Sequence, residues 1–338
     1  MPTMDERDAA AKRTSPCFTP NRRSSIPGHM PARPIVIVAQ PHLAPLIAVL
    51  TPQYEALPLW ESAGKAKLAD ACALVTAGEF RLAPDLLDAM PKLGLIACFT
   101  VGYDGIDVGS ARTRGIEVSH ALDANHEDVA DHAIGMIIAQ RRRIAEGDRI
   151  LRAGGWSADR KMISRSLGGA AIGIVGLGSI GLAVARRAEA MNMRIGWWGP
   201  TPKPSSAWPR ADTLMALASA SDILLIAARA HDDNAGLVSA EVIDALGPHG
   251  LLVNVARGQL LDEDALIAAL RERRIGGAAL DVYATEPTSA ARWADVPNTL
   301  LTPHTAGATD AAVARMTQML LANLAAFFAG SPLPTPVR

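Results

Sequence analysis

A glycine-rich loop between an apolar strand and a helix constrains the fold of this chain most. Residues 176–181 read GLGSIG, directly after the apolar run 171–175 and at the start of an alanine-rich helix. Gly176 permits a tight turn, Gly178 lets a pyrophosphate approach the backbone, and Gly181 allows the helix to pack closely on the strand. The phosphates would face the helix N-terminus. We therefore expect a dinucleotide site here, with Ser179 and Ile180 among its contacts.

Strands and helices alternate through most of the chain, which predicts an α/β protein with two domains. A doubly wound parallel sheet of the Rossmann type is expected over 126–304, and a smaller flavodoxin-like domain over 34–125 plus 305–338. A helix from about Thr309 to Phe328 would complete the smaller domain. The expected strands are 35–38, 73–76, 95–98 and 116–118 in the smaller domain, and 171–175, 194–198, 223–227, 251–255, 278–282 and 300–302 in the larger one.

Residues 1–33 differ in composition from the rest of the chain. They mix Pro, Ser and both charge signs, so we expect a disordered extension, or a true start at Met30. The formal net charge of the 338 residues is −1, which gives no electrostatic reason to expect nucleic acid or an anionic membrane. No apolar run reaches membrane-spanning length by our reading, so no membrane partner is expected.

Cysteine usage and charge spacing argue against two further classes of site. Cys17, Cys72 and Cys98 lack the spacing of a metal or redox motif, which predicts no metal site and a reduced, cytoplasmic setting. The consecutive arginines 141–143 fan around a predicted helix, which indicates a solvated or interface face rather than a nucleic-acid site.

The long helix predicted from about His126 to Arg152 would join the two domains. Its apolar face includes Val129 and Ile134 at core-facing spacings. That face and the segment 154–156, which ends in Trp156, are suited to isologous packing. We therefore expect a homodimer.

Three later segments supply the groups for a catalytic site. They read NVARG at 254–258, DVYATEP at 281–287 and TPHTAG at 302–307, and each follows an apolar strand. Arg257, Glu286 and His304 should therefore project from strand ends, where parallel sheets bind ligands. Arg offers a planar fork for a carboxylate, His carries a proton near neutral pH, and a neighbouring Glu raises the imidazole pKa. This combination predicts binding and protonation of a 2-keto acid.

The chain lacks the acidic residue that usually binds the adenosine ribose of NAD. After Trp198 it reads Gly199-Pro200-Thr201-Pro202-Lys203. A carboxylate there would repel a 2′-phosphate, so its absence beside Thr201 and Lys203 favours NADP over NAD. Trp197 and Trp198 could line the adenine, but one of the two should face the core. Arg229 either contacts the 2′-phosphate or is solvated.

These segments, with VGYDGID at 101–107, resemble the D-isomer-specific 2-hydroxyacid dehydrogenase family from Pro34 to Val337. The closest likeness is to the glyoxylate and hydroxypyruvate reductase branch, which often lacks the acidic ribose residue. The resemblance implies reduction of a small 2-keto acid to the D-2-hydroxy acid with NADPH or NADH. Arg257 would bind the substrate, His304 would donate the proton, and Glu286 would pair with His304.

The resemblance also implies further contacts. The smaller domain would be the substrate domain, with Gly78, Val101 and Gly102 in its carboxylate-binding loops, while Asp281 and Ala256 would lie among the cofactor contacts. Trp156 would either reach the substrate pocket of the partner subunit or pack in an ordinary interface. An alternative function is a regulatory protein of the same fold that senses a nicotinamide dinucleotide, because such regulators can retain the same three residues.

Overall fold

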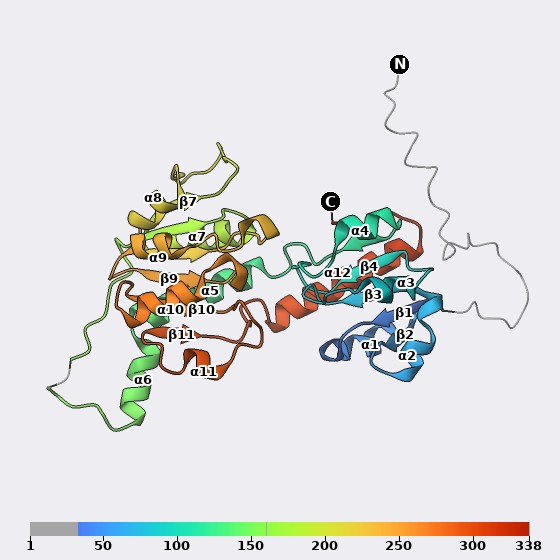
Figure 1. Ribbon diagram of the computed structural model, residues 1–338, viewed down its shortest axis with the longest axis horizontal. Helices are drawn as coiled ribbons and strands as arrows, with labels where there is room; N and C mark the ends of the chain where they lie inside the picture. Colours follow the sequence, from blue (N-terminus) through green and yellow to red (C-terminus); the bar gives the residue numbers. More distant parts are fainter. Residues whose placement is uncertain (1–32, 160, 338) are drawn as a thin grey trace, which may run out of the picture. The chain divides into compact units, whose positions relative to one another are not determined.

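The computed structural model describes residues 33–159 and 161–337, which form two compact units (Figure 1). The terminal unit contains residues up to Ala124 together with Asp310 onward, and the central unit runs from Asn125 to Thr309. The boundaries expected from the sequence, at 125/126 and 304/305, lie one residue after the first boundary and five residues before the second. The expected disordered extension, apart from residue 33, lies outside the described residues.

The central unit is built on a six-stranded sheet with the order β11-β10-β9-β8-β6-β7. All neighbouring strands are parallel. Every residue of β6, β8, β9 and β10 is buried, as expected for strands that are covered on both faces. The strands are β6 (Ala171–Val175), β7 (Arg194–Trp198), β8 (Ile223–Ile226), β9 (Leu251–Asn254), β10 (Gly277–Leu280) and β11 (Thr299–Leu301).

Helices cover both faces of this sheet. Helices α5 and α7 share one core with Ile174 and Val253, while α8, α9 and α10 share the other with Leu224 and Leu252. Alternate strand side chains point to opposite faces, so each strand contributes to both cores. The helices are α5 (His126–Arg141), α6 (Ile144–Arg152), α7 (Ser179–Ala190), α8 (Leu214–Ser219), α9 (Ala240–Leu246), α10 (Glu263–Arg271) and α11 (Ala290–Trp293), with short 3₁₀ turns at Asp232–Asn234 and Gly258–Leu260.

The terminal unit has a five-stranded parallel sheet with the order β2-β1-β3-β4-β5, the flavodoxin-like order. Its strands are β1 (Ile35–Val38), β2 (Glu55–Pro58), β3 (Ala71–Thr76), β4 (Leu95–Cys98) and β5 (Glu117–Ser119). Its helices are α1 (Pro45–Leu50), α2 (Ser62–Ala66), α3 (Pro84–Asp88), α4 (Val108–Thr113) and α12 (Asp310–Phe328), with 3₁₀ turns at Pro41–Leu43 and Leu68–Asp70. The sequence pattern does not predict β2, because this edge strand is only half-buried and contains Pro58, a residue that edge positions tolerate.

Helix α12 returns the chain to the terminal unit. By length and composition alone it could cross a membrane, so the expectation that no apolar run is long enough was wrong. However, Met316, Leu320 and Leu324 lie in the core that α1 and the sheet also form. The apolar composition of α12 is therefore explained by its packing inside the terminal unit.

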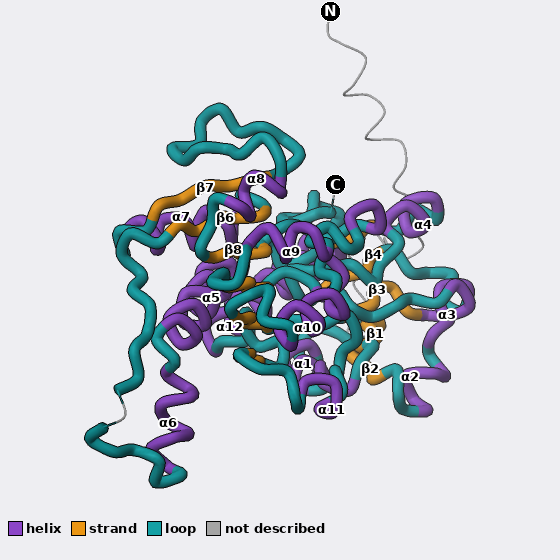
Figure 2. Tube along the Cα trace, turned by 60° about the vertical axis from the view of Figure 1, so that its left-hand side comes forward, coloured by secondary structure: helices purple, strands orange, loops and turns teal. Residues whose placement is uncertain are grey.

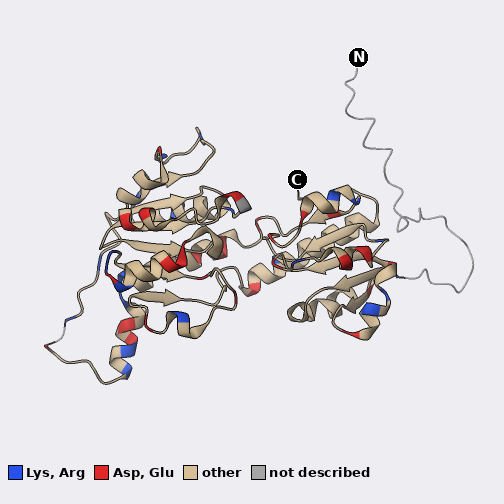
Figure 3. Ribbon diagram, in the orientation of Figure 1, with Lys and Arg blue, Asp and Glu red and all other residues tan. Residues whose placement is uncertain are grey.

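The long helix expected over 126–152 is broken into α5 and α6. Arg143 has a left-handed backbone with φ 53°, and its guanidinium contacts Glu146 at 2.6 and 2.5 Å. Arg141 is buried and donates to the carbonyl of Ser166 at 2.8 Å, so it does not belong to a solvated face as predicted. Helix α6 and the segment after it extend from the sheet of the central unit (Figure 2), and α6 carries both charge signs (Figure 3).

Candidate active site

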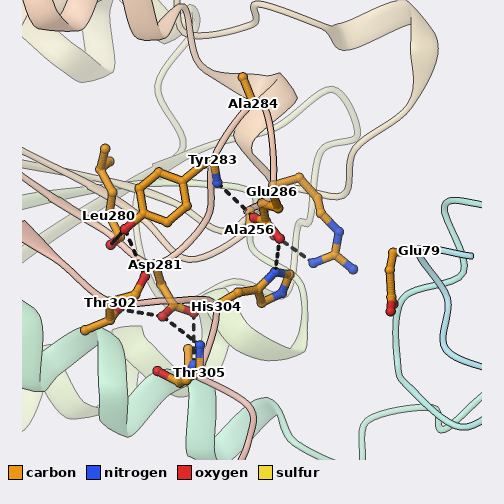
Figure 4. Close-up of polar contacts among 12 residues, drawn as sticks. Glu79, Ala256, Leu280, Asp281, Tyr283, Ala284, Glu286, Thr302, His304 and Thr305 are labelled. Atoms are coloured by element: carbon orange, nitrogen blue, oxygen red, sulfur yellow. Dashed lines mark hydrogen bonds and ion pairs between the residues drawn. The ribbon is translucent and has the colours of Figure 1, made fainter. Parts of the chain in front are cut away.

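The predicted catalytic residues follow three neighbouring strands of the central sheet. Arg257 comes after β9, Glu286 after β10 and His304 after β11, and these strands are adjacent in the order β11-β10-β9. The carboxyl ends of parallel strands lie at one edge of a sheet, so the fold brings the three side chains together. Figure 4 shows His304 and Glu286 pointing toward each other from the loops that carry them.

The buried carboxylate of Asp281 holds the loop that carries His304. Asp281 is 1% exposed, and it accepts hydrogen bonds from the Thr302 hydroxyl at 2.5 Å and from the N–H groups of Thr305 and Ala306 at 2.9 Å each (Figure 4). Its backbone carbonyl accepts from the His304 N–H at 2.8 Å. Both the side chain and the backbone of Asp281 therefore fix the turn after β11.

His304 has a backbone conformation that needs this support. Its φ is 52°, in the left-handed region, and such a conformation costs a non-glycine residue on the order of 1–3 kcal/mol. The turn aims the imidazole at Glu286, so that Nδ1 lies 2.6 Å from Oε2 of the carboxylate. Nε2 is then the ring nitrogen left to exchange a proton with a ligand.

Glu286 and His304 shift each other's pKa. The hydrogen bond with Glu286 raises the pKa of His304 above its ordinary value, against opposing effects of burial and of the Arg257 charge. Burial opposes ionisation of Glu286, but bonds from the His304 ring and the Tyr283 N–H outweigh it and lower the pKa of Glu286. The pair therefore favours an imidazolium beside a carboxylate near neutral pH.

The loop that carries Arg257 is shaped by Asn254, which is fully buried. The Asn254 side chain accepts from the Ala256 N–H at 3.0 Å and donates to the Arg257 carbonyl at 3.0 Å. Gly258 lies against the other loop, because a Cβ there would be 1.9 Å from the carbonyl carbon of Tyr283. This close contact couples the position of Arg257 to that of the loop carrying Glu286.

Two residues that sequence analysis did not single out also hold the loop 281–287. Tyr283 is buried and donates to the carbonyl of Thr302 at 2.9 Å, and burial raises the pKa of its phenol to about 12. Glu263, on α10, is buried and accepts from the Ala284 N–H and from Arg292 at 3.1 Å. In the sequence Glu263 is marked only as an acidic residue at the start of a helix, after Asp262, and acidic residues there are also typical of exposed positions.

Asp281 and Ala256, expected among the cofactor contacts, have their polar groups engaged within the central unit. The two oxygens of Asp281 accept the bonds described above, and Ala256 uses its N–H on Asn254 and its carbonyl on Arg257. Their observed contacts support roles in shaping the two loops. Contacts of these two residues with a dinucleotide remain predictions.

The glycine-rich loop has the geometry that a pyrophosphate requires. Gly176 has φ 94°, and a Cβ there would be 2.5 Å from the backbone of Ala228. A Cβ on Gly181 would be 2.2 Å from the carbonyl oxygen of Gly176, whereas one on Gly178 would meet no atom within 4 Å. Two glycines thus serve close packing, and the third leaves open space at the start of α7, where Ser179 and Ile180 begin the helix.

Two basic side chains lie near the end of β7, where the chain lacks an acidic residue to bind the ribose. Trp197 is buried as the core-facing member of the tryptophan pair, and Trp198 is partly exposed. Lys203 donates to the carbonyl of Leu177 in the glycine-rich loop. Arg210, which sequence analysis missed, donates to the carbonyl of Gly199 at 2.8 Å.

Sequence spacing could not reveal Arg210, because it lies at the far end of a long loop whose path depends on tertiary contacts. This loop joins β7 to α8 (Figure 2). Thr201 and Arg229 are exposed, and desolvation lowers the pKa of Arg229. A contact of Arg229 with the 2′-phosphate stays a prediction.

The three residues expected in carboxylate-binding loops lie together in the terminal unit. Gly78 follows β3, and a Cβ on it would be 1.7 Å from the carbonyl oxygen of Gly102. Thr100 links the two loops, since its hydroxyl accepts from the Gly78 N–H at 2.7 Å and donates to the Gly102 carbonyl at 3.0 Å. Among the described residues, the N–H groups of Val101 and Gly102 have no hydrogen-bond partner within the chain.

Two further predictions concern Trp156, expected at an interface or in a partner's substrate pocket, and metal binding. Trp156, after α6, is 76% exposed. Within residues 33–159 and 161–337, no group of three or more His, Cys, Asp or Glu side chains is placed to hold a metal ion.

Comparisons with known proteins find relatives of this chain. The profile of the family "D-isomer specific 2-hydroxyacid dehydrogenase, NAD binding domain" matches residues 134–306. Hydroxyphenylpyruvate reductase of Plectranthus scutellarioides is 40% identical over 253 residues, covering 75% of this chain and 81% of that protein. Glyoxylate/hydroxypyruvate reductase A of Arabidopsis thaliana is 40% identical over 252 residues, covering 75% of this chain and 80% of that protein.

A solved structure extends the similarity over nearly the whole chain. It is the NADPH-dependent glyoxylate/hydroxypyruvate reductase of Sinorhizobium meliloti in complex with NADP and malonate. The two chains are 36% identical with a TM-score of 0.82, and the match covers 90% of this chain and 97% of the other.

We predict that replacing Glu286 with Gln lowers the pKa of His304. The substitution keeps a hydrogen-bonding group but removes the negative charge that stabilises the imidazolium. NMR titration of the His304 ring should therefore show protonation at lower pH in Glu286→Gln than in the parent. Identical titration of His304 in both proteins would show that the pair does not control its proton.

Proposed function

The chain belongs to the D-isomer-specific 2-hydroxyacid dehydrogenase family, and on that basis we propose that it reduces glyoxylate, hydroxypyruvate or a similar small 2-keto acid to the D-2-hydroxy acid. It is an NAD(P)-dependent oxidoreductase of this family. The observation that carries the proposal is the 2.6 Å contact between His304 Nδ1 and Glu286 Oε2, beside Arg257.

The central unit fits a nicotinamide dinucleotide. The open side of Gly178 and the N-terminus of α7 would hold the pyrophosphate, and the end of β7 would receive the adenosine half. The bound dinucleotide supplies a hydride from its nicotinamide ring. The protein must then bind the keto acid and provide a proton for the carbonyl oxygen that gains negative charge.

His304 is the proton donor in the proposed mechanism. Glu286 fixes the ring through Nδ1 and keeps it charged, so Nε2 can hold the proton that the substrate oxygen receives. Arg257, with its planar fork, would bind the substrate carboxylate and polarise the carbonyl. In the terminal unit, the N–H groups of Val101 and Gly102 would bind the carboxylate, with Gly78 giving these loops their close packing.

The choice of substrate rests on the chemistry of the site and on the named relatives. The relatives that are 40% identical bear the names of reductases for hydroxyphenylpyruvate and for glyoxylate and hydroxypyruvate. The substrates in these names share a 2-keto acid group and differ in the side chain attached to it. We therefore propose the 2-keto acid group as the fixed requirement and, on the likeness to the glyoxylate/hydroxypyruvate reductases, a small side chain as the preferred one.

We predict that His304→Gln lowers the turnover number for hydroxypyruvate by roughly 10²- to 10⁴-fold, the usual contribution of a positioned acid. Steady-state assays should show this loss, while fluorescence titration should give an unchanged Kd for NADPH, because His304 lies outside the glycine-rich loop. His249→Gln, at an exposed position, serves as the control. Turnover within a few-fold of the parent would refute the role of His304.

We also propose that NADP is preferred over NAD. No carboxylate lies between Trp198 and Lys203, and Lys203 and Arg210 contact the backbone at Leu177 and Gly199. These contacts place two cations close to the residues expected at the ribose. The negative charge of a 2′-phosphate would be stabilised by these cations, whereas an unphosphorylated ribose carries no charge for them to stabilise.

We predict a lower Kd for NADPH than for NADH, and a selective loss of NADPH affinity in Gly199→Asp. A Cβ at Gly199 would lie 3.5 Å from the Trp197 ring, an ordinary contact, so Gly199→Ala controls for added size without charge. Fluorescence titration with both cofactors measures the effect. Equal affinities in the parent, or equal losses for both cofactors in Gly199→Asp, would contradict the proposal.

The segment around α6 supports a homodimer. Ile144 and Leu151 on α6 are 54% and 58% exposed, and Trp156 and Ile163 beyond it are 76% and 85% exposed. Apolar exposure concentrated on one projecting segment is typical of an interaction surface. We propose that a second copy of this chain covers it, with Trp156 at or near that copy's substrate site.

We predict a dimer in sedimentation velocity at micromolar concentration and a weakened dimer in Ile163→Asp, because the new charge would lose hydration in the interface. Val49→Asp changes another exposed apolar residue, 42% exposed and in the terminal unit, and should leave the dimer intact. A parent protein that stays monomeric throughout the concentration range would overturn this proposal.

Finally, we propose a cytoplasmic location. Cys98 is a buried free thiol, and burial raises its pKa to about 12. A thiol with this pKa is almost entirely protonated near neutral pH and therefore unreactive.

A further inference from the structure

His132, on α5, contacts Thr302 and Asp281, the two residues that anchor the His304 loop. Its Nε2 lies 3.1 Å from the Thr302 hydroxyl and 3.6 Å from Oδ1 of Asp281. Thr302 in turn lies 2.5 Å from the same Asp281 oxygen. His132 thus adds a polar group on a helix whose other inward-facing residues, such as Val129 and Ile134, belong to the apolar core.

The hydrogen positions in the contacts among His132, Thr302 and Asp281 follow from which groups can donate and which can accept. Asp281, as a carboxylate, can only accept, and it already receives the N–H groups of Thr305 and Ala306. The single proton of the Thr302 hydroxyl must therefore point to Asp281. The hydroxyl oxygen can then accept a hydrogen bond, and Nε2–H of His132 is placed to donate it.

This chain of bonds ends at the candidate proton donor. Thr302 and Thr305 flank His304 in the sequence, and the Asp281 carbonyl accepts the His304 N–H at 2.8 Å. His304 occupies a left-handed conformation, which persists only when its surroundings determine it. A bond that orients Thr302 therefore helps to determine where the His304 ring lies.

We propose that His132 is a positioning residue for the reaction: its Nε2–H orients the Thr302 hydroxyl, which fixes Asp281 and the turn that aims His304 at the substrate. The inference rests on the proposed role of His304 as the acid. His132 needs no contact with substrate or cofactor for this role. Its side chain is 26% exposed while that of Asp281 is 1% exposed, so the bond to Thr302 is partly shielded from water.

The test compares His132→Leu, which removes the donor, with His132→Gln, whose amide nitrogen can replace Nε2 as a donor to Thr302. Turnover of hydroxypyruvate with NADPH should fall roughly ten- to a hundred-fold in His132→Leu, the scale of a displaced catalytic group. His132→Gln should recover most of this loss. The Kd for NADPH should stay unchanged in both variants, and His249→Leu should behave as the parent.

A double-mutant cycle separates positioning of His304 from a general structural effect. If His132 acts through His304, adding His132→Leu to His304→Gln should change the residual turnover by less than about two-fold. The inference would be overturned if His132→Leu lowered turnover by the same factor in the parent and in His304→Gln. It would also be overturned if His132→Leu kept full turnover, or if His132→Gln were as impaired as His132→Leu. A His304→Gln protein with nearly full turnover would instead refute the proposed acid itself.

A second pair of variants covers the case in which His132→Leu does not fold. Thr302→Val removes the hydroxyl that links His132 to Asp281, and Thr302→Ser retains it. Turnover should fall in the Val variant and be largely preserved in the Ser variant, with an unchanged Kd for NADPH in both. Equal turnover in the two variants would contradict the proposed link.

Discussion

The buried carboxylate of Asp281 is the interaction on which the candidate site depends. A carboxylate removed from water is costly unless hydrogen bonds replace its hydration. Here the Thr302 hydroxyl and the N–H groups of Thr305 and Ala306 provide that replacement. The requirement of Asp281 for donors thereby folds the segment after β11 into one conformation, and the position of His304 follows from it.

The loop 281–287 supplies both the anchor and the partner of His304. Asp281 at its start holds the backbone of the turn after β11, while Glu286 near its end holds the imidazole. Tyr283 and Glu263 fix the loop between these points, and Gly258 brings the Arg257 loop against it. Local changes in this packing should therefore affect substrate binding and proton transfer together.

The sequence predicted the features that depend on local pattern. Apolar runs located every strand of the central sheet, and the glycine spacing located the turn into α7, because both follow from backbone geometry. The adjacency of Arg257, Glu286 and His304 was predictable since parallel strands end at one edge of a sheet. The pairing of His304 with Glu286 is present in the structure at 2.6 Å.

Features set by an unusual backbone conformation or by tertiary contacts were not predictable. The break at Arg143 depends on a left-handed residue and a bond to Glu146, whereas the helical periodicity continues through it. Arg210, Glu263 and His132 act through partners far away in the sequence, and no spacing rule identifies such partners. Edge strand β2 was missed because its half-buried alternation is weaker than that of a buried strand.

The pH dependence of the reaction in both directions tests the central claim most directly. Reduction needs His304 protonated and oxidation needs it neutral, and the pKa of His304 is raised above its ordinary value by Glu286. The measurement is kcat/KM from pH 5 to 10 for hydroxypyruvate with NADPH and for the D-hydroxy acid with NADP. The account predicts that reduction is lost, and oxidation gained, as pH rises through one common pKa above about 6.5. Profiles that fall together, or that show no common pKa, would contradict it.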